Sequence, residues 1–275
     1  MKKAKIIVLA GQSNAVGVGH TAYLPRHFDD KTIDRFKKGY ENVLINYFSH
    51  DKKSGGFVKT SVGCTEVSKD TLGPEVGIAQ TLTAKYPDEE FFIVKCAFGG
   101  TNLFHDWLPP SCGGDYDELA RDEGEHYRKA GWCFNELVSI MQESIIILEN
   151  AGYLPEIIAF CWMQGESDAD TSEHVSAYKM RCETLLSDFA NLFGKYYANF
   201  VFIDGGISEI WPLYREMNEI KKEFDGQADN RFYIDTIAQG LVTCNEPQPE
   251  VDTAHYDSDC TVKLGNLFAE YIKID

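Results

Sequence analysis

The residues of this chain best suited to catalysis are a serine near its N-terminus and an acid and an imidazole near its C-terminus. Ser13 lies in the segment Gly11-Gln12-Ser13-Asn14, directly after the apolar run 5–10, and Asp252 and His255 stand three residues apart. A serine hydroxyl is a poor nucleophile until a base takes its proton, which an imidazole can do near neutral pH. A carboxylate can hold that imidazole in the required tautomer, so these residue types suit a Ser-His-Asp hydrolase in any chain order. Taken alone, His255 would more often have a structural or surface role.

Two further polar segments follow apolar runs in the same way as Ser13 does. Gly99-Gly100-Thr101-Asn102 comes after the run 91–97, and Gln164-Gly165-Glu166-Ser167-Asp168 comes after the run 157–163. If these runs are parallel strands, their carboxyl ends meet at one edge of the sheet. We therefore expect both segments to lie near Ser13.

Acyl transfer needs hydrogen-bond donors aimed at the developing oxyanion. We expect two backbone donors, the N–H of Ser13 and the N–H of Gly100 or Gly99. The side-chain amide of Gln164 is the third expected donor. Each feature has a simpler explanation on its own, a tight turn for the two glycines and a loop amide that satisfies backbone groups for Gln164. Their convergence on one edge favours the catalytic interpretation.

Six apolar runs have the length and composition of buried strands. They are residues 5–10, 43–48, 91–97, 157–163, 200–204 and 232–235. Five segments with helical patterns are residues 74–86, 127–151, 171–193, 212–224 and 258–272. This alternation predicts an α/β fold with a mostly parallel sheet covered by helices on both faces. No linker or repeat interrupts the pattern, so we expect one domain over residues 1–275.

Two long segments without a strand or helix pattern, 20–40 and 101–125, begin at the expected active edge. Loops of this length in a compact domain tend to be functional, and both are candidate lids. Three residues of the second segment are candidates to line an acyl or sugar pocket: His105, Asp106 and Trp107. Packing is the more frequent role for aromatic residues in such segments, and it is the alternative for Trp107, Tyr116 and Trp132.

The composition limits the classes of partner. The chain carries 26 basic and 43 acidic residues, a formal net charge of −17, which repels nucleic acids and anionic lipids. No run approaches the ~18 apolar residues of a membrane span. The apolar core near the N-terminus, Ile6 to Ala10, is shorter than the roughly 7–15 residues of a secretion signal, which favours a cytoplasmic protein. Eight cysteines without a Cys-x-x-Cys pair favour free thiols.

An acidic cluster near the C-terminus raises the alternative of a hard-metal site. It comprises Asp252, Asp257 and Asp259 together with His255. A catalytic triad would already use two of these four residues, and Ser258-Asp259 suits the start of a helix. We therefore expect neither a metal nor another cofactor.

Together, the four polar segments resemble the SGNH-hydrolase superfamily, in particular the branch with the sialate O-acetylesterase-like proteins and the carbohydrate esterase family 6 acetylxylan esterases. The resemblance spans residues 5 to about 270 and preserves the order of the segments. It implies a three-layer α/β/α sandwich, flavodoxin-like, with about five parallel strands. It also implies that Ser13 is the nucleophile, His255 the base and Asp252 the third member of the triad.

The resemblance assigns the oxyanion glycine to Gly100, with Gly99 as the adjacent candidate. Gln164 stands where most of the superfamily has asparagine, a departure that this branch shares. Glu166 matches the branch's glutamate, and we expect it to fix the active-site loops through hydrogen bonds; a plain surface carboxylate is the alternative. Gln12 and Asn14 are expected to support the serine turn.

The predicted function is that of a metal-independent serine esterase that removes acetyl groups from a sugar or glycan, such as acetylated xylo-oligosaccharides or sialic acid. Two alternatives remain. One is a lipase- or thioesterase-like member of the same superfamily, and the other is a non-catalytic glycan-binding protein on the same fold. The sequence does not indicate the oligomeric state.

Overall fold

The computed structural model describes residues 2–64, 68–112, 129–197, 200–243, 245–246 and 252–274. Within these residues, six parallel strands form the centre of one sheet, in the order β10, β9, β8, β1, β7 and β3. Their bounds are Lys3–Gly11 for β1, Tyr40–Ser49 for β3, Phe91–Ala97 for β7, Leu154–Met163 for β8, Val201–Gly205 for β9 and Arg231–Ile234 for β10. Each strand contains or overlaps one of the six apolar runs, so the sheet has one parallel strand more than the family resemblance implied.

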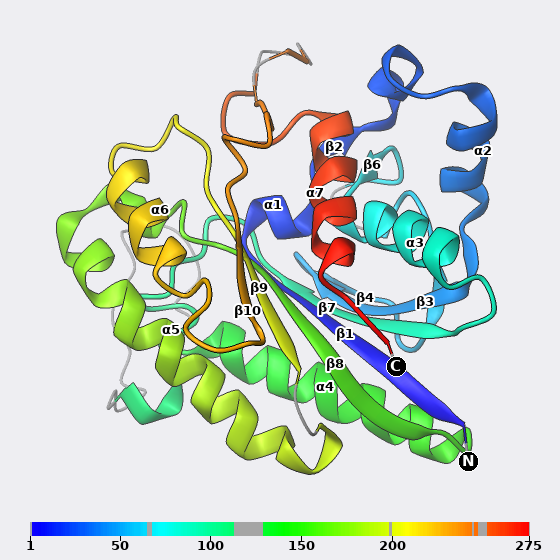
Figure 1. Cartoon of the computed structure of the whole chain (residues 1–275), viewed down its shortest axis with the longest axis horizontal. Coiled ribbons are helices and arrows are strands. Elements are labelled where there is room, and N and C mark those ends of the chain that lie inside the picture. The colour runs from blue at the N-terminus through cyan, green and yellow to red at the C-terminus, as the bar shows by residue number, and fades with distance from the viewer. Residues whose placement is uncertain are drawn as a thin grey trace.

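Helices cover both faces of this sheet. α3 (Pro74–Lys85) and α7 (Ser258–Glu270) lie on one face, and α4 (Trp132–Asn150) and α5 (Ser172–Phe193) lie on the other, as Figure 1 shows. α6 (Tyr214–Lys222) packs against α5, and α1 (Ser13–Val16) follows β1 directly. The predicted three-layer α/β/α architecture is confirmed.

Shorter elements complete the described fold. β4 (Lys52–Lys53) and β5 (Val58–Thr60) pair antiparallel with β3, and β2 (Gly19–His20) pairs antiparallel with β6 (Thr71–Leu72). Four 3₁₀ helices are η1 (Thr21–Arg26), η2 (Pro110–Cys112), η3 (Asp168–Asp170) and η4 (Gly194–Tyr196). No helix among the described residues combines the length and the apolarity that a bilayer span requires.

The prediction that 20–40 is irregular is wrong, because this segment holds η1 and α2 (Asp30–Lys38). The Asp29 side chain accepts a hydrogen bond from the Thr32 N–H at 2.7 Å, a standard helix N-cap. Ile33 and Phe36, three residues apart, are buried on the same side of the helix. Both signals are present in the sequence, but α2 is only nine residues long and mostly charged.

α3 and α7 approach each other closely because each has a glycine at the contact. A Cβ atom on Gly77 would lie 2.0 Å from the Val262 carbonyl oxygen, and one on Gly265 would lie 1.9 Å from the Pro74 carbonyl oxygen. Glycine within a helix is unfavourable by about 1 kcal/mol relative to alanine, so these positions are explained by packing and not by helix propensity. The predicted helices 74–86 and 258–272 therefore pack backbone against backbone.

One charged pair lies in the core beneath α1. Lys95 on β7 is fully buried, and its Nζ lies 2.8 Å from Glu75 Oε2 and 2.7 Å from the Val16 carbonyl oxygen. Glu75, on α3, is also fully buried and accepts the Gly73 N–H through its other oxygen. A buried lysine without such partners would be costly, so β7, α3 and the end of α1 depend on one another.

The other predicted helices differ from the structure mainly at their ends. The structure begins α4 at Trp132, whereas the predicted start, residues 127–128, lies outside the described residues. The described part of the segment 101–125 contains η2, and residues 113–125 lie outside the described residues. The seven described cysteines are free, and Cys244 lies outside the described residues.

Candidate active site

The expected nucleophile lies at the carboxyl end of the central strand. Gly11 is paired with Met163, and a Cβ atom on Gly11 would come within 1.8 Å of the Met163 carbonyl oxygen. Gly11 has a φ of +143°, which side chains disfavour. Backbone hydrogen bonds from Gln12 N to Met163 O and from Phe98 N to Gly11 O, 2.9 and 3.1 Å, fix the strand end on both sides. Ser13 therefore enters α1 from a rigid turn.

A pocket of about 340 Å³ opens above this turn. Ser13, Gly99, Gly100 and His255 are among its lining residues, so segments from the two ends of the chain and from the end of β7 meet there. The Cβ atom of Ser13 lies 3.8 Å from the position that a Cβ on Gly99 would take. Ser13 and His255 share the pocket but are not hydrogen-bonded to each other. In unliganded sites, catalytic hydrogen bonds are often long and tighten on binding.

His255 is paired with Asp252 on the same loop. The Nδ1 of His255 lies 2.6 Å from Asp252 Oδ2, and the other carboxylate oxygen accepts the N–H groups of Ala254 and His255 at 2.8 and 3.2 Å. Burial opposes ionisation of Asp252, but these hydrogen bonds and the nearby imidazole outweigh it and lower its pKa. An ionised Asp252 leaves the Nε2 of His255 as the ring nitrogen that can act as a base.

A chain of hydrogen bonds connects the β8 loop to the His255 loop through Asn14. The Nδ2 of Asn14 donates to Glu166 Oε1 at 2.8 Å, and its Oδ1 accepts the Tyr256 N–H at 3.0 Å. Glu166 is fully buried, and this burial raises its pKa. Its second carboxylate oxygen has no hydrogen-bond partner among the described residues. Glu166 is therefore a buried group that fixes Asn14 in the orientation needed to hold the residue after His255.

Gln12 holds the segment after β8. Its Oε1 accepts the N–H groups of Ser167 and Gly165 at 3.1 and 3.4 Å, and its Nε2 donates to the Ser167 hydroxyl at 3.3 Å. The residue before the expected nucleophile is thereby bonded to the loop of the Gln-Gly-Glu-Ser-Asp segment. Gln12 is nearly fully buried yet contributes to the pocket lining.

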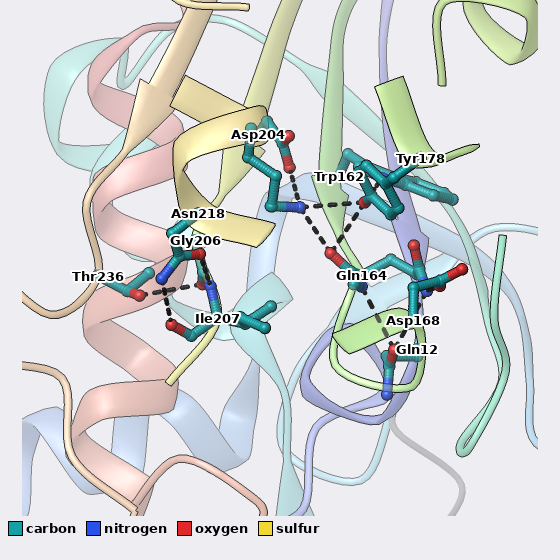
Figure 2. A network of polar contacts seen from close by, with 12 residues as sticks. Gln12, Trp162, Gln164, Asp168, Tyr178, Asp204, Gly206, Ile207, Asn218 and Thr236 are labelled. Carbon is teal, nitrogen blue, oxygen red and sulfur yellow. Dashed lines mark hydrogen bonds and ion pairs between the residues drawn. The ribbon is translucent and has the colours of Figure 1, made fainter. Parts of the chain in front are cut away.

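Gln164 does not lie on the pocket wall. It is fully buried, and its Nε2 donates to the Thr101 carbonyl at 3.2 Å, to Asp168 at 2.5 Å and to Gln12 at 3.3 Å. Figure 2 shows its side chain turned toward Gln12 and Asp168. The amide expected to face an oxyanion instead ties the loop after β7 to the loop after β8.

A buried network on the other side of Gln164 was not expected from the sequence. The Nζ of Lys221 forms a 2.6 Å ion pair with Asp204 and also donates to the Gln164 carbonyl at 2.6 Å. The Tyr178 hydroxyl donates to the same carbonyl at 3.1 Å. Figure 2 labels Asp204, Gln164 and Tyr178. Burial raises the pKa of Asp204 to about 6, although the Lys221 charge lowers it. One sequence signal exists, because Lys221 follows the buried Met217 by four residues and so lies on the same face of α6.

The loop after β7 is held by two buried acids. Asp168 accepts the N–H groups of Leu103 and Phe104 at 2.8 and 3.1 Å, and burial raises its pKa to about 6. Asp106 accepts the Asn102 N–H and the Trp132 indole N–H, both at 2.9 Å. These bonds fix the backbone that presents Gly99 and Gly100.

His105, Asp106 and Trp107 are not among the residues that line this pocket. Asp106 and Trp107 are fully buried, and the Trp107 indole donates to the Thr101 hydroxyl at 3.0 Å. For Trp107 and Trp132 the packing alternative is therefore correct, whereas Tyr116 lies outside the described residues. Asp259, a member of the acidic cluster noted in the sequence, has its Oδ2 3.5 Å from the Nδ1 of His27.

Among the pocket residues that the sequence pattern did not single out are two with ring side chains, His50 and Trp211. His50 follows β3 and is the one non-glycine residue of the described part with a positive φ, +59°. Its N–H donates to the Ala97 carbonyl at 3.1 Å, which holds this uncommon conformation beside Gly99. Trp211 follows β9. His50 had a signal, a polar residue just after a predicted strand, but Trp211 had none.

Solved structures share this fold. A protein from Arabidopsis thaliana superposes with a TM-score of 0.65 at 19% sequence identity, over 98% of each chain. NanS superposes with a TM-score of 0.67 at 16% identity, over 98% of this chain and 96% of that one. A carbohydrate acetylesterase from Xanthomonas citri gives 0.62 at 12% identity, over 97% of this chain and 55% of that one.

At these identities the structural likeness concerns the fold alone. No curated protein sequence matches the chain. The sequence model for "Carbohydrate esterase, sialic acid-specific acetylesterase" matches residues 3–273, nearly the whole chain. As the four polar segments indicated, the protein belongs to this carbohydrate esterase family.

Proposed function

We propose that this protein is a serine esterase that removes O-acetyl groups from a carbohydrate, with Ser13 as nucleophile, His255 as base and Asp252 as the residue that orients the base. The observation that carries the proposal is that Ser13 and His255 line one pocket while His255 is hydrogen-bonded to Asp252 at 2.6 Å. Membership of a carbohydrate esterase family supports the substrate class. Residues 1–275 would form one catalytic domain.

In this mechanism Ser13 Oγ attacks the acetyl carbonyl carbon while His255 Nε2 takes the hydroxyl proton. The resulting tetrahedral intermediate collapses to an acetyl-serine, and the departing sugar oxygen takes the proton from the imidazolium. A water molecule, deprotonated by the same imidazole, then attacks the acetyl-serine. The bond between Ser13 Oγ and the acetyl carbon breaks, Oγ takes the proton back from the imidazolium, and acetate is released. Asp252 stabilises the imidazolium in both steps.

The oxyanion needs donors at the position where negative charge develops. We assign this role to the backbone N–H groups of Ser13 and Gly100, with Gly99 as the neighbouring candidate, because all three residues line the pocket. We assign Gln164 a supporting role, because its amide already donates to the Thr101 carbonyl and to Asp168. The first hydrogen bond joins Gln164 to the backbone one residue beyond Gly100.

The test is acetate release from p-nitrophenyl acetate and from acetylated xylo-oligosaccharides by the wild type, Ser13→Ala, His255→Ala and the double variant. Because triad members act as a unit, each single variant is expected to lose about as much activity as the double variant, on the order of 10³-fold or more. Additive losses, or near-normal turnover by Ser13→Ala, would refute the mechanism.

The same experiment separates the two alternative functions. Activity that rises with acyl chain length along a series of p-nitrophenyl esters would indicate a lipase- or thioesterase-like enzyme. A folded wild-type protein without activity on any ester would indicate the glycan-binding protein.

A further inference from the structure

The pocket above Ser13 continues into a second, smaller hollow. The two share Val18 and His255, so they meet beside the proposed base. The second hollow has a volume of about 50 Å³, room for a hydroxyl or hydroxymethyl group but not for a sugar ring. Three carboxylates line it, Glu246, Asp252 and Asp257, together with the imidazoles of His20 and His255. We call it the acidic hollow.

The carboxylates of the acidic hollow are held by the protein. Glu246 accepts the Ser258 N–H at 2.9 Å and the Ser258 hydroxyl at 2.7 Å, one on each oxygen. The Asn245 N–H lies 3.3 Å from both oxygens of Asp257. Each carboxylate oxygen has a second lone pair, so the hollow can accept hydrogen bonds from sugar hydroxyl groups. A ligand that carried a carboxylate of its own into the hollow would be repelled by these negative charges.

The larger pocket offers apolar surface. Val16, Val18, Trp211 and Ala254 contribute to its lining. Two hydrogen bonds hold the backbone around Trp211. The Trp211 carbonyl accepts the Tyr214 N–H at 3.2 Å, and the Leu213 N–H donates to the Ala169 carbonyl at 3.0 Å. Its indole nitrogen is buried without a hydrogen-bond partner among the described residues. Trp211 is partly exposed and lines the pocket, so part of its aromatic side chain is available to a sugar there.

We propose that the substrate of this site is an uncharged O-acetylated sugar whose ring packs on Trp211 and one of whose hydroxyl groups enters the acidic hollow. An O-acetylated sialate, which carries a carboxylate, is then a poor substrate. This inference rests on the proposed esterase function and deepens it. It departs from the substrate in the family's description, because the carboxylate of a sialate would meet the carboxylates of Glu246, Asp252 and Asp257 beside His255.

The test compares acetate release from matched substrates. The first pair is 9-O-acetyl-N-acetylneuraminate and its carboxyl methyl ester, which differ in charge but share the acetylated arm. A methyl 2-O-acetyl-xylopyranoside serves as the neutral sugar. At low ionic strength kcat/KM is expected to be at least tenfold higher for the methyl ester and for the xyloside than for the sialate. Raising the salt concentration should narrow this gap, because screening weakens the repulsion.

Two variants test whether Glu246 repels the sialate and whether Trp211 contacts the sugar ring. Glu246→Gln should raise the sialate-to-methyl-ester ratio of kcat/KM several-fold, whereas Glu143→Gln, an exposed glutamate on α4 that changes net charge equally, should not. Trp211→Leu should lower kcat/KM at least tenfold more for the xyloside than for p-nitrophenyl acetate, mainly through KM. A purely structural role of Trp211 would lower both substrates alike.

Four outcomes are decisive. A wild type that prefers the sialate to its methyl ester, or a ratio that Glu246→Gln leaves unchanged, would overturn the inference while the esterase function stands. A folded wild type without activity on p-nitrophenyl acetate and all sugar acetates would refute the esterase function and the inference with it. If Trp211→Leu lowered kcat/KM equally for the xyloside and for p-nitrophenyl acetate, packing of the sugar ring on Trp211 would be refuted.

Discussion

Ser13 and His255 line the same pocket, but the two sides of the site are held in different ways. Ser13 follows a strand whose end is fixed between β7 and β8, and the carboxylates that support this side, such as Glu166 and Asp168, are almost completely buried. On the other side, the side chains of His255 and Asp252 are 26% and 46% exposed. The nucleophile side is therefore set by the core of the fold and the base side by a few local hydrogen bonds.

Substitutions on the two sides should therefore affect different properties of the protein. A substitution on the base side should reduce the rate without unfolding the protein, because few buried contacts depend on it. A substitution in the supports of the nucleophile side should reduce stability first, and activity as a consequence.

The largest expected effect comes from Asp252→Asn. It removes the carboxylate that orients His255, and in triads such a change lowers kcat by about 10³–10⁴-fold. The free energy of unfolding should change by less than about 1 kcal/mol, because the side chain is half-exposed. Steady-state kinetics and urea unfolding measure the two quantities. A variant that retained more than a tenth of the wild-type kcat would contradict the assignment of Asp252.

Lys221→Met should have the largest effect on stability. It leaves Asp204 buried without its counter-charge, which typically lowers the free energy of unfolding by about 3–5 kcal/mol. Lys222→Met, at the exposed neighbouring position of the same helix, is the matched control and should change it little. Equal stabilities of the two variants in urea would show that the nucleophile side does not depend on this network.

Asn14 connects the two sides, so its variants sharpen the comparison. Asn14→Ala removes both the bond to Glu166 and the bond to Tyr256, and a displaced base should lower kcat by about 10–100-fold with little change in KM. Asn14→Asp keeps an acceptor for the Tyr256 N–H but loses the donor to Glu166. If it recovers much of the activity, the bond to the His255 loop is the important one. A higher KM with an unchanged kcat would refute a positioning role for Asn14.

The smallest expected effect concerns pH. Asp168 has its pKa raised to about 6 in the folded protein, above the ~3.9 of an unfolded chain, so folding takes up a proton between these values. This group therefore makes the free energy of unfolding fall as the pH rises from about 4 to about 6, by an amount on the order of 1–3 kcal/mol.

Asp252 has a lowered pKa and acts in the opposite direction, because its contribution is present above the unfolded pKa and is lost as the pH falls through the folded one. Urea unfolding at several pH values should show a flatter curve between pH 4 and 6 for Asp168→Asn than for the wild type. An unchanged slope would show that Asp168 is already ionised in the folded state.

The sequence contained most of the information about the sheet. Each of the six apolar runs is part of a parallel strand, because a strand buried on both faces must be apolar nearly throughout. For the same reason the positions after β1, β7 and β8 could be assigned to one edge, and residues from all three line or support the pocket.

The direction of a side chain beyond a strand end could not be predicted. Gln164 and Trp107 were expected at or near the pocket, but both are fully buried, and their donors serve Thr101, Asp168 and Gln12. Two of the three partners of Gln164, Thr101 and Gln12, lie more than 50 residues away in the sequence, and only Asp168 is local. The partner of Trp107 is six residues away, but no sequence pattern pairs the two side chains. Trp211 was missed because nothing in its local sequence distinguishes a pocket residue from a packing residue.

The bond from the Lys95 ammonium to the Val16 carbonyl has a consequence for how activity can be used as an assay. Val16 ends the short helix that begins with Ser13, and the Lys95 ammonium that holds the Val16 carbonyl is itself paired with the Glu75 carboxylate of α3. A chain in which α3 is still detached would contain every triad residue and yet lack the support of the serine turn. Regain of turnover after dilution from denaturant should therefore report completed assembly of the protein, and not merely collapse of the sheet.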